Sequence, residues 1–510
     1  MQPMHLDRES AITAAEPMPA PAVTLLELDQ PVSAPGRSLT RDSILFGLGT
    51  FAGKASGFIV VPILARLLAP EAFGRLDVLN ALVSSGLLIV MLGTDVATVR
   101  LFFDRSTDEE RRRLFATWGV VVLSIAAIPT VVLIAGADPI SSALFGSTQL
   151  GPAIALVGVA LMAGIVHFVT LGVLRATGRP LPYALLEGGA LAVNALLAVV
   201  LVATWRADAT AVMLALAISW STAAVIGLVV VRGSIIARPS GSAARAILAL
   251  ALPLAPAIGA TWGADFFHRA FLLGTTGATQ AAYLSMATRI GSIAMLVVAA
   301  AQLAWHPHAY RLGVTPDATR RLAAEGRQIL VALVVTVGLL GLFAPEVLQA
   351  IGGDPYRGAA PALGLFLVSV LGVGVFTIAS LASAIERRTG DIGTAVVIGV
   401  TVAVALNLAL ARTYGAVGTA FAIAIGQFVA AGIATLLGRR RLAIPFAWRP
   451  VLALVVVAIV VVLASTVTGP IPVVGRLALG LGLLIGLLAE GTLPHWLAIV
   501  RDRGRRSERG

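Results

Sequence analysis

Long apolar segments separated by short polar ones recur along most of the chain. A helix that crosses a bilayer needs about 20 predominantly apolar residues, and fourteen segments satisfy this requirement. They lie roughly at 43–67, 76–94, 114–136, 150–172, 182–204, 211–231, 246–268, 281–304, 328–348, 360–384, 391–411, 416–437, 450–468 and 475–499. The pattern predicts an all-α polytopic membrane protein with about 14 transmembrane helices and, because the links are short, no soluble domain.

The two ends of the chain differ from this pattern. Residues 1–42 are polar and rich in proline, and they contain no apolar stretch long enough for the core of a signal peptide. We therefore expect a disordered cytoplasmic tail there. Residues 500–510 are strongly basic and predict a second, shorter cytoplasmic tail.

Composition agrees with a lipid surrounding. Hydrophobic residues make up 58% of the chain and charged residues 12%, with a mean hydropathy of +0.93. Soluble domains contain about 45–50% apolar and about 25% charged residues. The chain has no cysteine, which excludes disulfides and thiolate chemistry.

Arginine placement predicts the orientation of the spans. If the N-terminus is cytoplasmic, the inside segments hold 28 arginines and the outside segments six. The positive-inside rule selects this topology, with both termini in the cytoplasm. The net charge of +11 is then explained by the contact of these segments with anionic headgroups, so we expect no nucleic-acid partner.

Two spacings indicate an internal repeat. Gly74 and Ser84 have the same separation as Ala282 and Ser292, about 208 residues later. This offset covers six spans, an even number, so the two halves keep the same orientation.

A second match has nearly the same offset, because Asn194 is followed by Asn407 after 213 residues. The repeat predicts two six-helix lobes, at 43–232 and 245–438, related by a pseudo-two-fold axis along the membrane normal. Two extra helices, within 450–499, lie outside the repeat.

Several passages resemble the bacterial oligosaccharide and polysaccharide flippases of the multidrug/oligosaccharidyl-lipid/polysaccharide (MOP) exporter superfamily. They are the stretch from Ser43 to Gly74, the stretch from Gly93 to Phe103, the stretch from Asp265 to Arg269 followed by Tyr283, and the stretch from Leu406 to Ala420. The resemblance covers residues 43–440. It implies two lobes around a central cavity, alternating access, and a polyprenyl-diphosphate-linked sugar as cargo.

Charged residues inside the spans are the first candidates for the cargo site, because each costs about 2.5–3.5 kcal/mol in a bilayer and such residues usually face a cavity. Lys54 lies near the middle of the first predicted span and Arg289 about a third of the way into the eighth. Both could hold a diphosphate, which arginine binds bidentately. Alternatively, each pairs with a carboxylate or carbonyl of its own lobe.

Arg66 and Arg269 lie near the outer ends of the first and seventh spans. They are candidates for guiding the headgroup at the exit, and the alternative is that they extend to the membrane surface.

Three further residues are candidates for ion coupling. Asp265 and His268 lie one helical turn apart, and they form either a proton-coupled pair or a bond that fixes a helix end. Glu187 faces either the cavity or a neighbouring helix. His167 is interpreted as a packing residue.

Asp77, Asp95 and Arg100 lie near the ends of the second span, and we expect Asp95 to pair with Arg100. We expect no catalytic residue, metal site or cofactor. A GxxxxGK[ST] nucleotide loop does not occur in the sequence, so we expect the energy to come from an H⁺ or Na⁺ gradient, from removal of the cargo, or from both.

The favoured function is a flippase that moves a lipid-linked oligosaccharide from the cytoplasmic to the outer leaflet of the bacterial inner membrane for cell-surface polysaccharide assembly. Its expected partners are this cargo, membrane lipids and a polysaccharide polymerase or export machinery. The alternatives are a flippase of peptidoglycan lipid precursor, a multidrug exporter of the same superfamily, and, in another class, a membrane-embedded glycan-processing enzyme.

Overall fold

A computed structural model describes residues 60–312, 315–386 and 388–440, together with 442, 444–446, 455–460 and 462–463. Lys54, both predicted tails and the fourteenth predicted span lie outside the described residues. Only the end of the first predicted span and part of the thirteenth are described. The described part is almost entirely helical and contains no strand.

The N-terminal lobe agrees with the sequence pattern. Its helices are α2 (Pro70–Met91), α3 (Thr94–Phe103), α4 (Asp108–Ala135), α5 (Ala137–Phe145), α6 (Gly151–Ala176), α7 (Pro180–Thr204) and α8 (Ala209–Ile235). The long helices begin at local signals. Thr107 and Glu110 form a capping box at the start of α4, and the carboxylate of Asp208 accepts bonds from the first backbone amides of α8.

The C-terminal lobe contains the second set of long helices. They are α10 (Ala255–Thr276), α11 (Ala278–Leu312), α12 (Pro316–Leu342), α13 (Ala344–Gly352), α14 (Ala360–Ala379), α15 (Leu381–Ile385) and α16 (Thr389–Arg439), and the short helix α9 (Gly241–Ala251) precedes them. Within α16, Gly415 has a φ of 56° and a ψ of −135° and separates two helices. The sequence predicts the eleventh and twelfth spans on either side of this glycine.

The number of apolar helices fits the predicted spans. In the described residues, nine helices are long and apolar enough to cross a membrane, or ten if the bent pair α9 and α10 counts as one crossing. Dividing α16 at Gly415 gives eleven, which correspond to the second through twelfth predicted spans. The chain is therefore a multi-pass membrane protein.

The seventh span differs from its predicted range of 246–268. The chain bends by 64° between α9 and α10, at the 3₁₀ turn Leu252–Leu254. Pro253 lies in this turn, and its missing N–H and its ring both interrupt a continuous helix. As a result α9 packs against α3 and α4 of the N-terminal lobe, whereas α10 packs against α2, α11 and α16.

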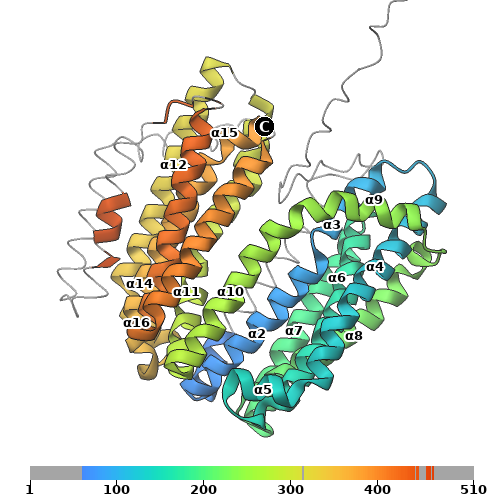
Figure 1. The fold of residues 1–510 in the computed structure, drawn as a ribbon, viewed down its shortest axis with the longest axis horizontal. Helices are drawn as coiled ribbons and strands as arrows, with labels where there is room; N and C mark the ends of the chain where they lie inside the picture. The colour runs from blue at the N-terminus through green and yellow to red at the C-terminus, as the bar shows by residue number, and fades with distance from the viewer. Residues whose placement is uncertain are drawn as a thin grey trace, which may run out of the picture.

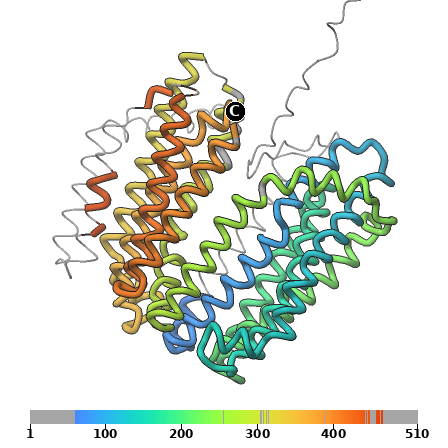
Figure 2. The backbone as a smooth tube through the Cα atoms, viewed as in Figure 1, coloured from blue at the N-terminus to red at the C-terminus, as the bar shows by residue number. Residues whose placement is uncertain are grey.

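The two lobes meet at one end and separate towards the other (Figure 1, Figure 2). The separated end carries the link between α3 and α4 and the start of α12, which the arginine pattern places in the cytoplasm. The lobes meet where α2 and α11 begin, at the end predicted to be outside.

Contacts between α2 and α11 follow the predicted repeat. The Thr279 hydroxyl donates to the Glu71 carboxylate at 3.1 Å, and the Ser285 hydroxyl donates to Asp77 Oδ1 at 2.6 Å, and in each pair the residues are 208 positions apart. On a two-fold axis a position contacts its own equivalent. The pseudo-two-fold axis therefore passes between α2 and α11.

Candidate functional site

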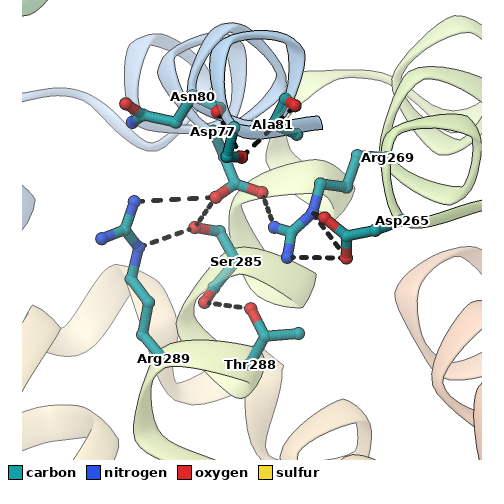
Figure 3. Close-up of polar contacts among 9 residues, drawn as sticks. Asp77, Asn80, Ala81, Asp265, Arg269, Ser285, Thr288 and Arg289 are labelled. Carbon is teal, nitrogen blue, oxygen red and sulfur yellow. Dashed lines mark hydrogen bonds and ion pairs between the residues drawn. The ribbon is translucent and has the colours of Figure 1, made fainter. Parts of the chain in front are cut away.

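A group of charged side chains joins the two lobes where they meet. Asp77 of α2 lies between Arg269 of α10 and Arg289 of α11 (Figure 3). The Asp77 side chain is only 5% exposed. Because an isolated buried carboxylate is costly, this burial is consistent with the two guanidinium groups beside it.

Arg269 is held by two carboxylates. Its Nη1 forms an ion pair and hydrogen bond with Asp77 Oδ2 across the lobe boundary. Its Nε lies 3.3 Å from Oδ2 of Asp265, one turn earlier on α10. Arg269 is thus neutralised on both sides and fixes α10 against α2.

Arg289 is held more loosely. Its Nε donates to the Ser285 hydroxyl at 3.2 Å, and its Nη2 lies 3.7 Å from Asp77 Oδ1. The guanidinium carbon is 5.5 Å from the centre of the Phe73 ring, which is close enough for a cation–π contact. A third of the Arg289 side chain is exposed, so it keeps donors that can meet a ligand.

A cavity of about 290 Å³ lies against this group. Its lining residues are Asp77, Asn80, Ala81, Ser84, Asp265, Arg269, Thr288, Arg289 and Ser292. All nine belong to α2, α10 or α11 on the lobe boundary, and they include Asn80 with Thr288 and Ser84 with Ser292, again 208 positions apart. The cavity therefore lies on the pseudo-two-fold axis.

The cavity departs from symmetry in its charges. Arg289 occupies the position equivalent to Ala81, and Asp77 the position equivalent to Ser285. The formal charges of Asp77, Asp265, Arg269 and Arg289 cancel. Both oxygens of Asp77 are already bonded, so the strongest unused hydrogen-bonding capacity in this group belongs to the Arg289 guanidinium.

The site lies inside the membrane span rather than at its surface. Asp77 is seven residues from the start of α2, and Ser285 is seven from the start of α11. At a rise of about 1.5 Å per residue, both are about 10 Å from the predicted outer end. The cavity is thus separated from the outside by roughly two helical turns of packed chain.

Close backbone packing closes this outer end. A methyl group on Gly74 would overlap the carbonyl oxygen of Ala278, so α2 and α11 approach as closely as glycine permits. The Gln280 side chain accepts a bond from the Ala416 amide at 3.0 Å. Arg66 Nη2 donates to the Ala350 carbonyl at 2.6 Å and links the two lobes.

The structure brings together some predicted site residues and separates others. Arg269 and Arg289 share one carboxylate, although the sequence analysis assigned them to the exit and to the cavity. Arg66 lies at the closed outer end, away from this group. Lys54 lies outside the described residues. The role of each in binding cargo stays a prediction.

The ion-coupling candidates also separate. Asp265 forms its ion pair with Arg269 instead of His268, and His268 is buried. Glu187 faces a neighbouring helix, because its Oε2 lies 3.0 Å from His167 Nε2.

Asp95 lies 4.0 Å from Arg175 of α6, which replaces the predicted pair with Arg100. In a helix, Asp95 and Arg100 are five positions apart, whereas favourable pairs are three or four apart.

The sequence pattern does not predict the central role of Asp77, and it does not single out Ser285 as a site residue. Asp77 was interpreted only as a residue near a helix end. The repeat contained the missing signal, because an offset of 208 from Asp77 leads directly to Ser285. Within the described residues, no group of three or more His, Asp or Glu side chains could hold a metal ion.

No protein family and no curated protein matches the sequence, but solved membrane transporters have the same architecture. The lipid II flippase MurJ, in an inward closed conformation, superposes with a TM-score of 0.65 at 13% identity, over 89% of this chain and all of that one. The MATE transporter VcmN from Vibrio cholerae gives 0.55 at 15% identity, over 79% of this chain and 95% of that one. An outward-facing MATE family transporter of the MOP superfamily gives 0.52 at 18% identity, over 81% and 95%. At these identities the likeness shows a shared two-lobe transporter fold.

Proposed function

We propose that this protein is a flippase for a lipid-linked oligosaccharide with an anionic diphosphate headgroup, and not an enzyme. In the proposal it works in the bacterial inner membrane with both termini in the cytoplasm. The cargo enters from the cytoplasmic side, where the lobes are apart, and leaves on the outer side for surface polysaccharide assembly.

The observation that carries this proposal is the position of Arg289. It reaches the cavity on the pseudo-two-fold axis with unused donors. A diphosphate offers several acceptor oxygens, and guanidinium groups bind such anions through paired hydrogen bonds. The lipid tail stays in the bilayer, as its apolar surface requires.

Competition between Asp77 and the diphosphate for Arg269 and Arg289 gives a mechanism for opening the outer end. Asp77 is the carboxylate of the N-terminal lobe that Arg269 and Arg289 of the C-terminal lobe share. An arriving diphosphate carries more negative charge than one carboxylate and draws both guanidinium groups away from it. The outer junction then loses its ionic contact across the lobes, which favours opening on that side.

A multidrug exporter is a further candidate because of Asp265. Its side chain is 40% exposed and lines the cavity, so a cationic drug could pair with it. A flippase of peptidoglycan lipid precursor is the third candidate. It fits the same chemistry of a diphosphate headgroup, and the solved neighbour MurJ is described as a lipid II flippase.

The test is flipping by the full chain in proteoliposomes. The measured quantity is the rate at which polyprenyl-diphosphate oligosaccharide becomes protected from a membrane-impermeant reagent. Arg289→Ala should reduce the rate about 10- to 100-fold, because bonds to charged groups contribute about 1.5–3 kcal/mol. Arg412→Ala is the matched control, since Arg412 lies over the Phe271 ring and does not line the cavity.

Equal rates for Arg289→Ala and the wild type would show that the headgroup binds elsewhere. Drug transport that Asp265→Asn abolishes, with no flipping of any lipid-linked sugar, would identify an exporter. Flipping of lipid II in preference to other lipid-linked sugars would identify the third candidate.

A further inference from the structure

A second titratable pair lies away from the cavity, inside the N-terminal lobe. His167 of α6 and Glu187 of α7 are joined by a 3.0 Å contact between Nε2 and Oε2. The His167 side chain is 2% exposed and that of Glu187 is 23% exposed. The other ring nitrogen, His167 Nδ1, has no hydrogen-bond partner in the described part of the chain.

The pair must hold a proton to be neutral. With one proton shared between the imidazole and the carboxyl, the 3.0 Å contact is a hydrogen bond in either arrangement. Without that proton the pair carries one negative charge among apolar helices, which is costly. Binding and release of a proton therefore changes the charge of the pair that joins α6 to α7.

The surroundings supply no ionic partner for the deprotonated pair. The helices that pack against α6 and α7 carry these other titratable groups: Glu71, Arg75, Asp77, Asp95, Arg100, Asp138, Arg175 and Arg232. Asp77 lies inside its span and is paired with Arg269, and the others lie in the first or last two turns of their helices. The acidic and basic run at the start of α4 is likewise at a helix end, as is Arg179, which donates to the Val230 carbonyl. Tyr183 lies one turn before Glu187 and has interactions of its own. Arg175 is paired with Asp95 at 4.0 Å.

The pair lies near the predicted cytoplasmic end of α7. Glu187 is seven residues, or about 10 Å, from the start of α7 at Pro180. The link before Pro180 belongs to the end of the molecule that the arginine pattern places in the cytoplasm. Glu187 is also the more exposed member of the pair.

We infer that His167 and Glu187 form a proton-binding site, which takes up and releases one proton and thereby couples flipping to the proton gradient. Proton binding itself is independent of the cargo, whereas the coupling rests on the proposed flippase function. Asp265 and His268 stay a separate prediction for ion coupling, and Asp265 forms an ion pair with Arg269.

Proton binding is tested without cargo by pH-difference infrared spectroscopy of the full chain in lipid nanodiscs. The wild type should show a protonated-carboxyl band that appears as the pH falls. Glu187→Gln should remove one component of the band, because the amide keeps a hydrogen bond to His167 but cannot bind a proton. His167→Gln should keep this component, because the Glu187 carboxyl is still present.

The matched control is Glu325→Gln. Glu325 Oε1 lies 3.3 Å from His308 Nε2, but both side chains are substantially exposed, so this variant should retain the component that Glu187→Gln removes. Identical difference spectra for the wild type and Glu187→Gln would overturn the assignment of the proton site.

Coupling is tested by imposing a pH gradient on proteoliposomes. The wild type should flip cargo faster with the gradient than without it. In Glu187→Gln, the increase in flipping rate that the gradient causes should be at least fivefold smaller. An unchanged gradient dependence in Glu187→Gln would overturn the coupling role. If the wild type flips no cargo under any condition while the infrared band is confirmed, the proposed function fails and the proton site stands.

Discussion

At the scale of single residues, Asp77 determines how the two lobes are joined. Its carboxylate forms ion pairs with Arg269 and Arg289 and accepts a hydrogen bond from Ser285. Removing one partner of a buried ion pair leaves the other charge unpaired, which costs about 3–5 kcal/mol. The outer junction is therefore expected to be sensitive to changes at this one position.

Asp77→Ala should lower the free energy of unfolding by about 3–5 kcal/mol, because Arg269 then keeps only Asp265. The measurement is the free energy of unfolding of the purified wild type and variant, both in the same detergent. Asp354→Ala is the control, since the Asp354–Arg357 pair is exposed and contributes at most about 1 kcal/mol.

The double variant Asp77→Ala with Arg269→Ala should be less destabilised than the sum of the two single variants, because neither charge is left without the other. An additive result would mean that the two side chains do not depend on one another.

Charged residues within apolar segments were predictable as candidates, but their partners were not. Arg269 and Arg289 stand out in the sequence because charge is rare in membrane spans. Their common partner Asp77 lies on a helix of the other lobe, 192 positions from Arg269. Composition and spacing carry no information on such contacts, except where the internal repeat aligns two positions.

At the scale of helices, Gly415 decides that α16 is two spans and not one. Its ψ of −135° combined with a positive φ is accessible almost only to glycine. The side chain of Gln280 also occupies the space that a Cβ would need. The turn between the eleventh and twelfth spans was predicted correctly because the apolar pattern is interrupted there.

Gly415→Ala should destabilise the protein by about 1–3 kcal/mol through backbone strain. Thermal unfolding in detergent measures the effect. Gly432→Ala on the same helix is the control: a Cβ there meets no atom within 4 Å, and alanine favours a helix by about 1 kcal/mol. Equal stability of the two variants would contradict the role of Gly415.

The bend between α9 and α10 shows the limit of the apolar pattern at this scale. Residues 246–268 are apolar throughout most of their length, which predicts one straight span. Pro253 interrupts the helix, but a proline within a membrane span is tolerated often enough that the sequence does not decide the outcome. The packing of α9 on α3 and α4 stabilises the bent arrangement.

At the scale of the whole molecule, the lobes are closed at the predicted outer end and apart at the other (Figure 1). Alternating access requires the outer contacts to break during each cycle. These contacts include the Thr279–Glu71 bond and the close approach of α11 to Gly74.

Cross-linking Glu71→Cys to Thr279→Cys with a short cleavable bifunctional thiol reagent should stop flipping in proteoliposomes, and cleavage of the linker should restore it. The chain contains no cysteine, so no background reaction interferes. A control cross-link between Gln349→Cys and Arg357→Cys joins residues of one lobe and should leave the rate unchanged. Flipping by the first cross-linked protein would contradict movement of the lobes at this end.

The central claim is that the cargo is a lipid-linked sugar that crosses from the cytoplasmic to the outer leaflet. The most direct measurement is the sidedness of lipid-linked oligosaccharides in cells that lack this protein, using a membrane-impermeant glycan-modifying reagent. The account predicts that a protected species facing the cytoplasm accumulates and that Arg289→Ala fails to reverse this. Unchanged sidedness, with no accumulation of any lipid-linked sugar, would contradict it.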